Sequence, residues 1–128
     1  MLRIRQEMME ALSRGVLATY EDNVVAHAWR AFPERCEALG EAGTREMAQH
    51  GMIRAPMYGI VGERDVCRYI DLMFALGRDF DLDRHLPWAH EILHNQAWSP
   101  HRRLTRLCDR AIEHLRSATA RGTQSKET

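Results

Sequence analysis

The sequence predicts an all-α protein, a compact bundle of five to six helices, on three observations. Apolar residues recur at helical spacing along most of the chain. Alternating strand patterns are almost absent, and only residues 59–62 look extended, which is too short for a sheet. The chain has 128 residues, 45% of them hydrophobic, which suits one globular domain. We therefore expect a single helical domain over residues 1–121 and a disordered polar tail over residues 122–128.

The first predicted helix covers residues 2–32. Its apolar residues fall four apart and drift slowly round the helix axis: Ile4, Met8, Leu12, Val16, Tyr20 and Val24. Gly15 and the polar residues 21–23 are consistent with either one long helix or two. Pro33 ends the pattern, because proline disrupts a helix interior but is tolerated in a first turn, so a short turn restarts there.

Two further helices are expected between glycines. The first covers residues 41–58, with Gly40 before it and Gly59 as its C-cap. The second covers residues 63–76 and ends at Gly77. One face of this second helix is apolar, formed by Val66, Ile70, Met73 and Phe74, and acidic residues occupy its first turn, where the helix dipole favours them.

Residues 78–85 are predicted to form a loop with alternating acids, Asp79, Asp81 and Asp83. This pattern resembles the start of a calcium-binding EF-hand loop, which needs glycine at its sixth position and glutamate at its twelfth. Arg84 and His90 stand at those positions, so calcium binding is not expected. We expect the acids to cap backbone groups in a turn, with Phe80 and Leu82 pointing into the core.

The end of the chain contains two more predicted helices. Pro87 suits the first turn of a short helix that continues to His94. Ser99 and Pro100 form an N-cap and a first-turn proline for the last helix. The apolar residues of that helix predict a wide stripe facing the core: Leu104, Leu107, Cys108, Ala111, Ile112 and Leu115.

The charge balance and the cysteines limit the classes of function. Lysine and arginine number 18, and aspartate and glutamate also number 18, so no net field draws the chain to nucleic acid or an anionic membrane. No apolar run has the ~18 residues of a membrane helix, and residues 1–14 lack the apolar block of a signal peptide. Cys36, Cys67 and Cys108 lie far apart, as is typical of reduced cytosolic thiols. We expect a cytoplasmic protein that binds neither nucleic acid nor membrane.

The segment from His90 to His94 matches the HExxH motif of zinc peptidases. In that motif two histidines at i and i+4 share one helix face and bind zinc, and the glutamate, here Glu91, activates a metal-bound water as the base. Glu113 is the candidate third ligand.

Other features of the chain argue against a zinc site. The predicted helix is short, and polar Asn95 and Gln96 follow His94 where such enzymes continue an apolar helix. The chain also supplies no sheet to shape a substrate cleft. We therefore expect ordinary surface histidines and no cofactor, and a small zinc hydrolase using His90, His94 and Glu113 is the alternative.

The candidate partner-binding residues are two tryptophans and two methionines: Trp88, Trp98, Met8 and Met9. Tryptophan is enriched among interface hot spots, and methionine gives an adaptable contact surface, although both also fill cores. A basic stripe in the last helix, formed by Arg102, Arg103, Arg106 and Arg110, is most simply a solvated face. The broad stripe of residues 2–32 packs either internally or against a second copy in a homodimer.

Six blocks of the sequence resemble a family of small, uncharacterised bacterial helical proteins encoded beside type VI secretion spike and effector genes. The blocks are MLRIRQEMM at 1–9, AFPERC at 31–36, YGI at 58–60, ERDVCRYIDLMF at 63–74, GRDFD at 77–81 and LPWA at 86–89. Together they cover about residues 1–95. The HExxH segment is not part of the family pattern, and Pro56 departs from it.

The resemblance implies a cytoplasmic accessory role and supplies no catalytic residues. It suggests an adaptor or co-chaperone that holds a type VI secretion effector or spike component before export. Such a protein would be non-enzymatic and would bind another protein. An immunity protein that neutralises a cognate toxin is a second role that this gene neighbourhood suggests.

Overall fold

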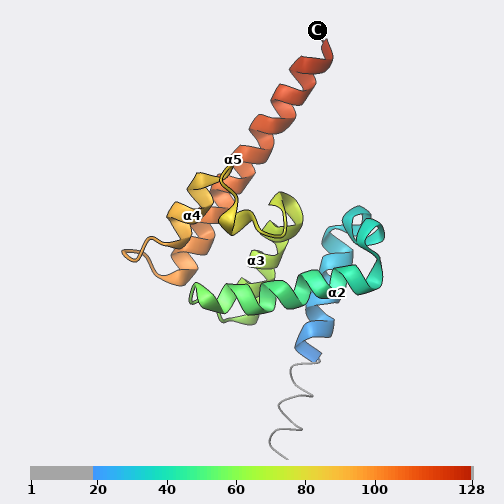
Figure 1. The fold of residues 1–128 in the computed structure, drawn as a ribbon, viewed down its shortest axis with the longest axis vertical. Coiled ribbons are helices and arrows are strands. Elements are labelled where there is room, and N and C mark those ends of the chain that lie inside the picture. The colour runs from blue at the N-terminus through green and yellow to red at the C-terminus, as the bar shows by residue number, and fades with distance from the viewer. Residues whose placement is uncertain (1–18, 128) are drawn as a thin grey trace, which may run out of the picture. The chain divides into compact units, whose positions relative to one another are not determined.

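The computed structural model describes residues 19–127, and over this range the chain is all-α, as predicted (Figure 1). A helical segment over residues 19–31 is followed by α2 (Pro33–Met57), α3 (Glu63–Leu76), the 3₁₀ turn η1 (Phe80–Leu82), α4 (Pro87–Leu93) and α5 (Pro100–Glu127). The described residues contain no strand. The start of the first predicted helix, residues 2–18, lies outside the described part of the chain.

The chain divides into two compact units, residues 1–50 and residues 51–128, where we expected one domain over 1–121. The division falls between His50 and Gly51, inside α2. No run of proline, glycine or serine marks it, so composition gave no indication of this boundary.

In the first unit, proline and glycine set the helix boundaries. Phe32 is non-helical and Pro33 begins α2, as the sequence predicts. α2 is kinked at Gly40, where φ is 76° and ψ is 174°, a left-handed φ that favours glycine. Thr44 donates a 3.4 Å hydrogen bond across the kink to the backbone carbonyl of Cys36. This bond satisfies a buried carbonyl near the break in the helix.

In the second unit, α3 has the predicted bounds and packs against α5. Its residues Val66, Ile70, Met73 and Phe74 are buried. Gly51, in the last part of α2, lies so near α3 that a Cβ there would stand 2.3 Å from Ile70 Cγ1. The absence of a side chain at this glycine therefore allows the close approach of the two helices.

The turn between α3 and α4 differs from the prediction. Phe80 is buried as expected, but Leu82 is 61% exposed and Asp81 is completely buried. Because η1 is a tight 3₁₀ turn, its consecutive side chains point in different directions, and the acid rather than the leucine faces the interior. Asp83 acts as predicted, accepting a 2.8 Å hydrogen bond from the backbone N–H of His85.

The start of α5 follows the prediction, whereas its later part does not. Ser99 Oγ accepts a 3.2 Å hydrogen bond from the backbone N–H of Arg102, which is an N-cap bond. Leu104, Leu107 and Ala111 are buried where α5 packs against α3 and α4.

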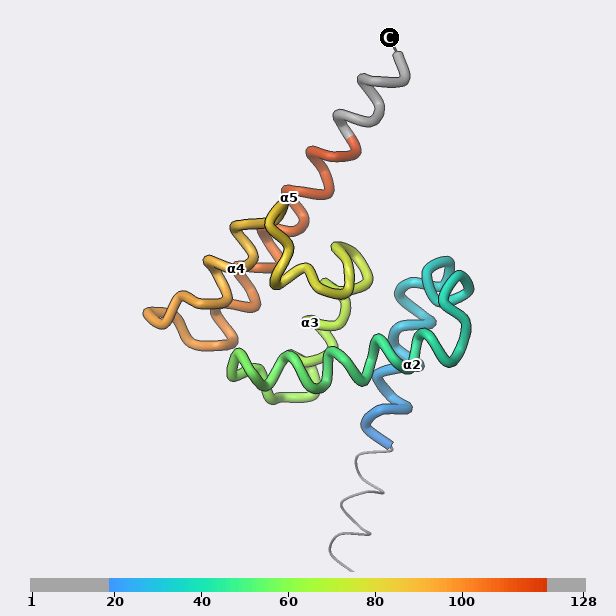
Figure 2. Tube along the Cα trace, viewed as in Figure 1, coloured from blue at the N-terminus to red at the C-terminus, as the bar shows by residue number. Residues whose placement is uncertain are grey.

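The expectation that the whole apolar stripe faces the core is wrong for its last turns. Ile112 is 47% and Leu115 39% exposed, and Figure 2 shows α5 continuing beyond α4. α5 runs to Glu127, so the predicted disordered tail lies within this helix apart from Thr128, which is outside the described residues. None of residues 123–127 is a proline that would stop the helix. No helix in the described part of the chain is long and apolar enough to cross a membrane.

Candidate functional site

The HExxH segment does not form the helical face that a zinc peptidase needs. α4 ends at Leu93, so His94 is its C-cap rather than a residue of a continuing helix. The His90 and His94 rings stack with centroids 4.0 Å apart. His94 Nδ1 lies 2.9 Å from the backbone carbonyl oxygen of His90, a contact that closes the end of the helix. Both imidazoles and Glu91 are exposed.

The third candidate ligand does not complete a metal site. Glu113 is an exposed residue of α5. Among the residues whose side chains the structure describes, no group of three or more histidine, cysteine, aspartate or glutamate residues is arranged to hold a metal ion. The two histidines lie side by side, but Glu113 does not join them, so the set His90, His94 and Glu113 is not assembled into a metal site.

Trp88 and Trp98 instead belong to a surface that also contains arginines of α5. The Arg110 guanidinium carbon lies 4.9 Å from the centroid of the Trp88 ring, and the Arg102 guanidinium carbon lies 5.3 Å from that of Trp98. Both distances are within cation–π range. Both tryptophans are half-buried, and Arg106 is exposed one turn from each arginine. We call these five residues the Trp–Arg surface.

The arginines of the Trp–Arg surface have no acidic partner among the described residues. Asp109 and Glu113 are on the same helix, but neither forms an ion pair with Arg102, Arg106 or Arg110. A guanidinium stacked on an indole keeps its N–H edges available for a carboxylate. This surface is therefore able to bind an acidic group from outside the chain.

Arg103, the fourth arginine of the predicted solvated stripe, is not solvated. It is only 6% exposed. Its Nη1 donates a 2.7 Å hydrogen bond to the Leu93 carbonyl, and its Nε donates a 3.2 Å bond to the Trp98 carbonyl. The expectation fails because consecutive residues of a helix point about 100° apart, so Arg103 faces α4 while its neighbour Arg102 does not.

Sequence reasoning missed a buried polar cluster in the second unit. Asp81 Oδ2 accepts hydrogen bonds from the Tyr58 hydroxyl at 2.5 Å and from Arg54 Nε at 3.1 Å, and also pairs with a terminal amino group of Arg54. The Asp81 side chain is fully buried, and that of Arg54 is 21% exposed. The sequence gives little indication of this pairing, because an aspartate in an acidic loop predicts a turn and Arg54 lies 27 residues earlier.

The ionisation of this cluster follows from its burial. Burial raises the pKa of Asp81, but the hydrogen bonds from Tyr58 and Arg54 outweigh it and hold the pKa below its usual value. Burial, together with the hydrogen bond to Asp81, raises the pKa of Tyr58 to about 12. Burial likewise raises the pKa of the Tyr69 hydroxyl. The cluster at neutral pH is thus an arginine–carboxylate pair beside neutral phenols, which fits a structural contact.

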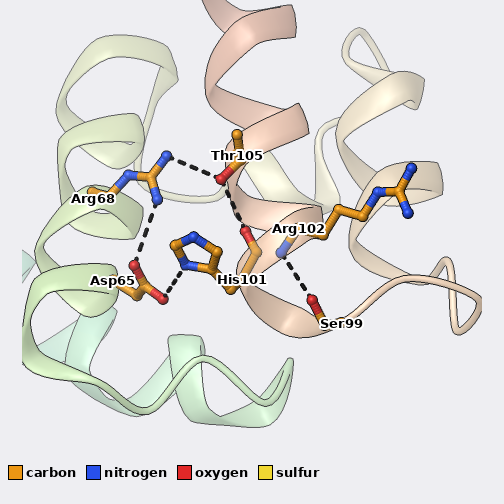
Figure 3. Close-up of polar contacts among 6 residues, drawn as sticks. All are labelled: Asp65, Arg68, Ser99, His101, Arg102 and Thr105. Atoms are coloured by element: carbon orange, nitrogen blue, oxygen red, sulfur yellow. Dashed lines mark hydrogen bonds and ion pairs between the residues drawn. The ribbon is translucent and has the colours of Figure 1, made fainter.

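A second polar cluster joins α3 to α5 at the surface (Figure 3). His101 Nδ1 lies 2.9 Å from Asp65 Oδ2, and Arg68 contacts both Asp65 and Thr105 at 3.5 Å. The hydrogen bond from His101 lowers the pKa of Asp65. Figure 3 also shows the Arg102 side chain pointing away from this cluster, so the Trp–Arg surface is separate from it.

Met8 and Met9 lie outside the described residues. Cys67 is half-buried on α3, and burial raises the pKa of its thiol, as it does for Cys108. A thiol with a raised pKa is less reactive than a free cysteine.

Comparison with protein-family models, curated proteins and solved structures finds no match to this chain. One observation on the described part of the chain bears on function, and it is the Trp–Arg surface.

Proposed function

We propose that this protein is a non-enzymatic adaptor that holds another protein through an acidic segment of that partner. The observation that supports this role most directly is the Trp–Arg surface, where Trp88 and Trp98 are each covered by an arginine that pairs with no acidic side chain among the described residues. Tryptophan and arginine are the residue types most enriched among interface hot spots. Their combination favours a partner that offers carboxylates beside apolar groups.

The spacing of the arginines favours a helical acidic segment. Arg102, Arg106 and Arg110 follow one another at single turns of α5, so they span about 12 Å along the helix axis. A partner helix with carboxylates at i, i+4 and i+8 has the same spacing. Such a helix lying alongside α5 would place one carboxylate against each guanidinium, with its apolar residues over the edges of the two indoles.

The resemblance to the bacterial family suggests which partner this is. On that basis we propose a type VI secretion effector or spike component, held in the cytoplasm before export. An immunity protein would use a binding surface in the same way but would suppress the activity of its partner. The two roles therefore differ in the consequence of binding.

Co-expression with each product of the neighbouring genes tests this proposal. We expect one of these products to co-elute with the protein as a stable complex. Arg110→Glu should weaken that complex at least tenfold, and Trp88→Ala about 30-fold, as loss of a hot-spot residue does. Arg64→Glu, which reverses an exposed arginine on α3, is the matched control and should bind like the wild type.

Two results would contradict the adaptor role. One is a failed binding test, in which no product of a neighbouring gene co-elutes with the protein, or in which the control Arg64→Glu weakens the complex as much as Arg110→Glu does. The other is that the partner proves to be a toxin whose killing this protein suppresses, since that outcome would replace the adaptor with an immunity protein.

A further inference from the structure

Arg103 is a buried cation that has no anionic partner among the described residues. Its side chain is enclosed between α4 and the start of α5, and only 6% of the residue is exposed. Its two hydrogen bonds go to neutral groups, the carbonyls of Leu93 and Trp98. No carboxylate in the described part of the chain forms an ion pair with it. Burying an unpaired charge is costly, so the positive charge needs an explanation.

The C-terminal end of α4 compensates only part of the positive charge of Arg103. The Leu93 carbonyl is at the C-terminal end of α4, where a cation interacts favourably with the helix dipole. A helix terminus carries at most about half an elementary charge, and α4 is short. At least about half of the Arg103 charge is therefore left without a counter-charge at this position.

The uncompensated charge lies at a cleft. Arg103 lines a cavity of about 430 Å³ together with Met57, Tyr58, Gly59, Leu93, His94 and Gln96. This volume is within the range of small-ligand sites. The cleft lies wholly in the second unit, and it has both apolar walls, from Met57 and Leu93, and polar groups at its rim, from His94 and Gln96.

The second terminal nitrogen of Arg103, Nη2, is the atom available to a ligand. It donates no hydrogen bond to any described residue, and it is not fully buried. It lies near Gly59, because a Cβ on that glycine would stand 3.9 Å from Nη2. Guanidinium carries five N–H donors, of which the two hydrogen bonds to carbonyls use one each from Nε and Nη1. The two N–H groups of Nη2 are therefore free at the cleft.

We propose that this cleft binds a carboxylate, with Arg103 Nη2 as its central donor and the Gln96 side-chain amide as a donor at the rim. A single free guanidinium edge matches the planar carboxylate group. The apolar walls suit a ligand whose carboxylate is attached to a hydrocarbon chain. Phosphate is disfavoured, because its higher charge calls for more cations than Arg103 supplies among these lining residues.

The other charges near the cleft do not oppose this assignment. Asp81 lies behind Tyr58, and its carboxylate is paired with Arg54. The Tyr58 hydroxyl donates to Asp81, so it does not compete for the ligand as an anion. This proposal uses different residues from the Trp–Arg surface and stands whether or not the adaptor role is correct.

Calorimetric titration of the full chain tests the site with four probes. These are acetate, inorganic phosphate, and a short apolar peptide with one glutamate compared with its glutamine counterpart. We expect the glutamate peptide to bind at least tenfold more tightly than the glutamine peptide. The side-chain Nε–H resonance of Arg103 should shift during the titration, which ties binding to this arginine.

The variants separate ligand binding from folding. Arg103→Met also removes the cap of α4, so Gln96→Glu is the informative change, since Gln96 is exposed. The added charge at the rim should weaken binding of the glutamate peptide at least tenfold. Arg64→Gln changes the net charge by the same amount on the exposed surface of α3 and should leave binding unchanged.

Each outcome decides the proposal. If acetate binds as tightly as the glutamate peptide, the site is supported and its ligand is a free carboxylate. If the glutamate peptide binds more tightly than acetate, the site is supported and its ligand is a protein segment. Equal binding of the two peptides, no binding of any probe, a preference for phosphate, or unchanged binding in Gln96→Glu would overturn it.

Discussion

Replacing Arg54 by methionine is expected to destabilise the protein by about 3 kcal/mol near neutral pH. Arg54 donates two hydrogen bonds to Asp81 Oδ2, one of them from Nε at 3.1 Å. Methionine keeps much of the aliphatic stem but removes the guanidinium. The fully buried carboxylate of Asp81 is then left with the Tyr58 hydroxyl as its side-chain donor.

The size of this effect follows from the burial of the two partners. Removing one member of a buried ion pair typically costs about 3–5 kcal/mol, because the other charge remains buried. We expect the lower end, since Tyr58 still donates at 2.5 Å and Arg54 is 21% exposed. Adding Asp81→Asn to Arg54→Met should recover about 1 kcal/mol, because burying a neutral amide costs less than burying a carboxylate.

The pH dependence of the loss gives an independent check. The pKa of Asp81 in the folded protein is lower than its usual value. Such a group stabilises the fold above its unfolded pKa of about 3.9, and this stabilisation is lost as the pH falls through the folded pKa. In Arg54→Met, the guanidinium no longer lowers the pKa of Asp81, so the effect of burial raises that pKa above its value in the wild type. The buried carboxyl then takes up a proton more easily, and the cost of the substitution should shrink toward about pH 4.

Urea unfolding followed by far-UV circular dichroism, at neutral pH and at about pH 4, measures both effects. Arg64→Met, at an exposed arginine of α3, is the control and should change stability by less than about 0.5 kcal/mol. A cost for Arg54→Met below about 1 kcal/mol, or one that is the same at both pH values, would refute the reasoning.

Three further changes test local features of the fold, each by urea unfolding. Gly51→Ala should cost about 1–3 kcal/mol, because its Cβ would stand 2.3 Å from Ile70 Cγ1; a neutral effect would mean that α2 and α3 are less closely packed. Ser99→Ala should cost about 1 kcal/mol by removing the N-cap of α5, and Ser99→Asp should restore it. Asp65→Asn should cost less than about 1 kcal/mol at neutral pH, because its partner His101 is 70% exposed. The pKa of Asp65 is lowered on folding, so this cost should vanish as the pH falls below about 4, and a cost that grows in acid would contradict that contact.

The local elements could be predicted because their determinants are close together in the sequence. Glycine and apolar spacing fixed the bounds of α3, and Ser99 and Pro100 fixed the start of α5. Pro33 and Gly40 were identified as breaks, and the structure places a helix start and a kink at them. In each case one residue limits the backbone of its own turn, so no distant contact is needed to decide the outcome.

The sites could not be predicted in the same way. The sequence contains the HExxH spacing, but His94 lies just beyond the end of α4. The length of this helix depends on where the chain turns to meet α5, which the spacing does not reveal. The tryptophans were identified as candidates from residue type alone. The guanidiniums that cover Trp88 and Trp98 follow from the packing of α4 and its connection against α5.

The sequence by itself determined the helical class of this protein and the ends of several helices, because periodicity and backbone restriction act within a few residues. Only the tertiary structure decided that Asp81 is buried, that Arg103 faces a cleft while Arg102 faces an indole, and that Ile112 is left exposed. Those outcomes depend on which helix covers which face. A charged residue in a loop or stripe has the same local pattern whether or not a partner segment approaches it.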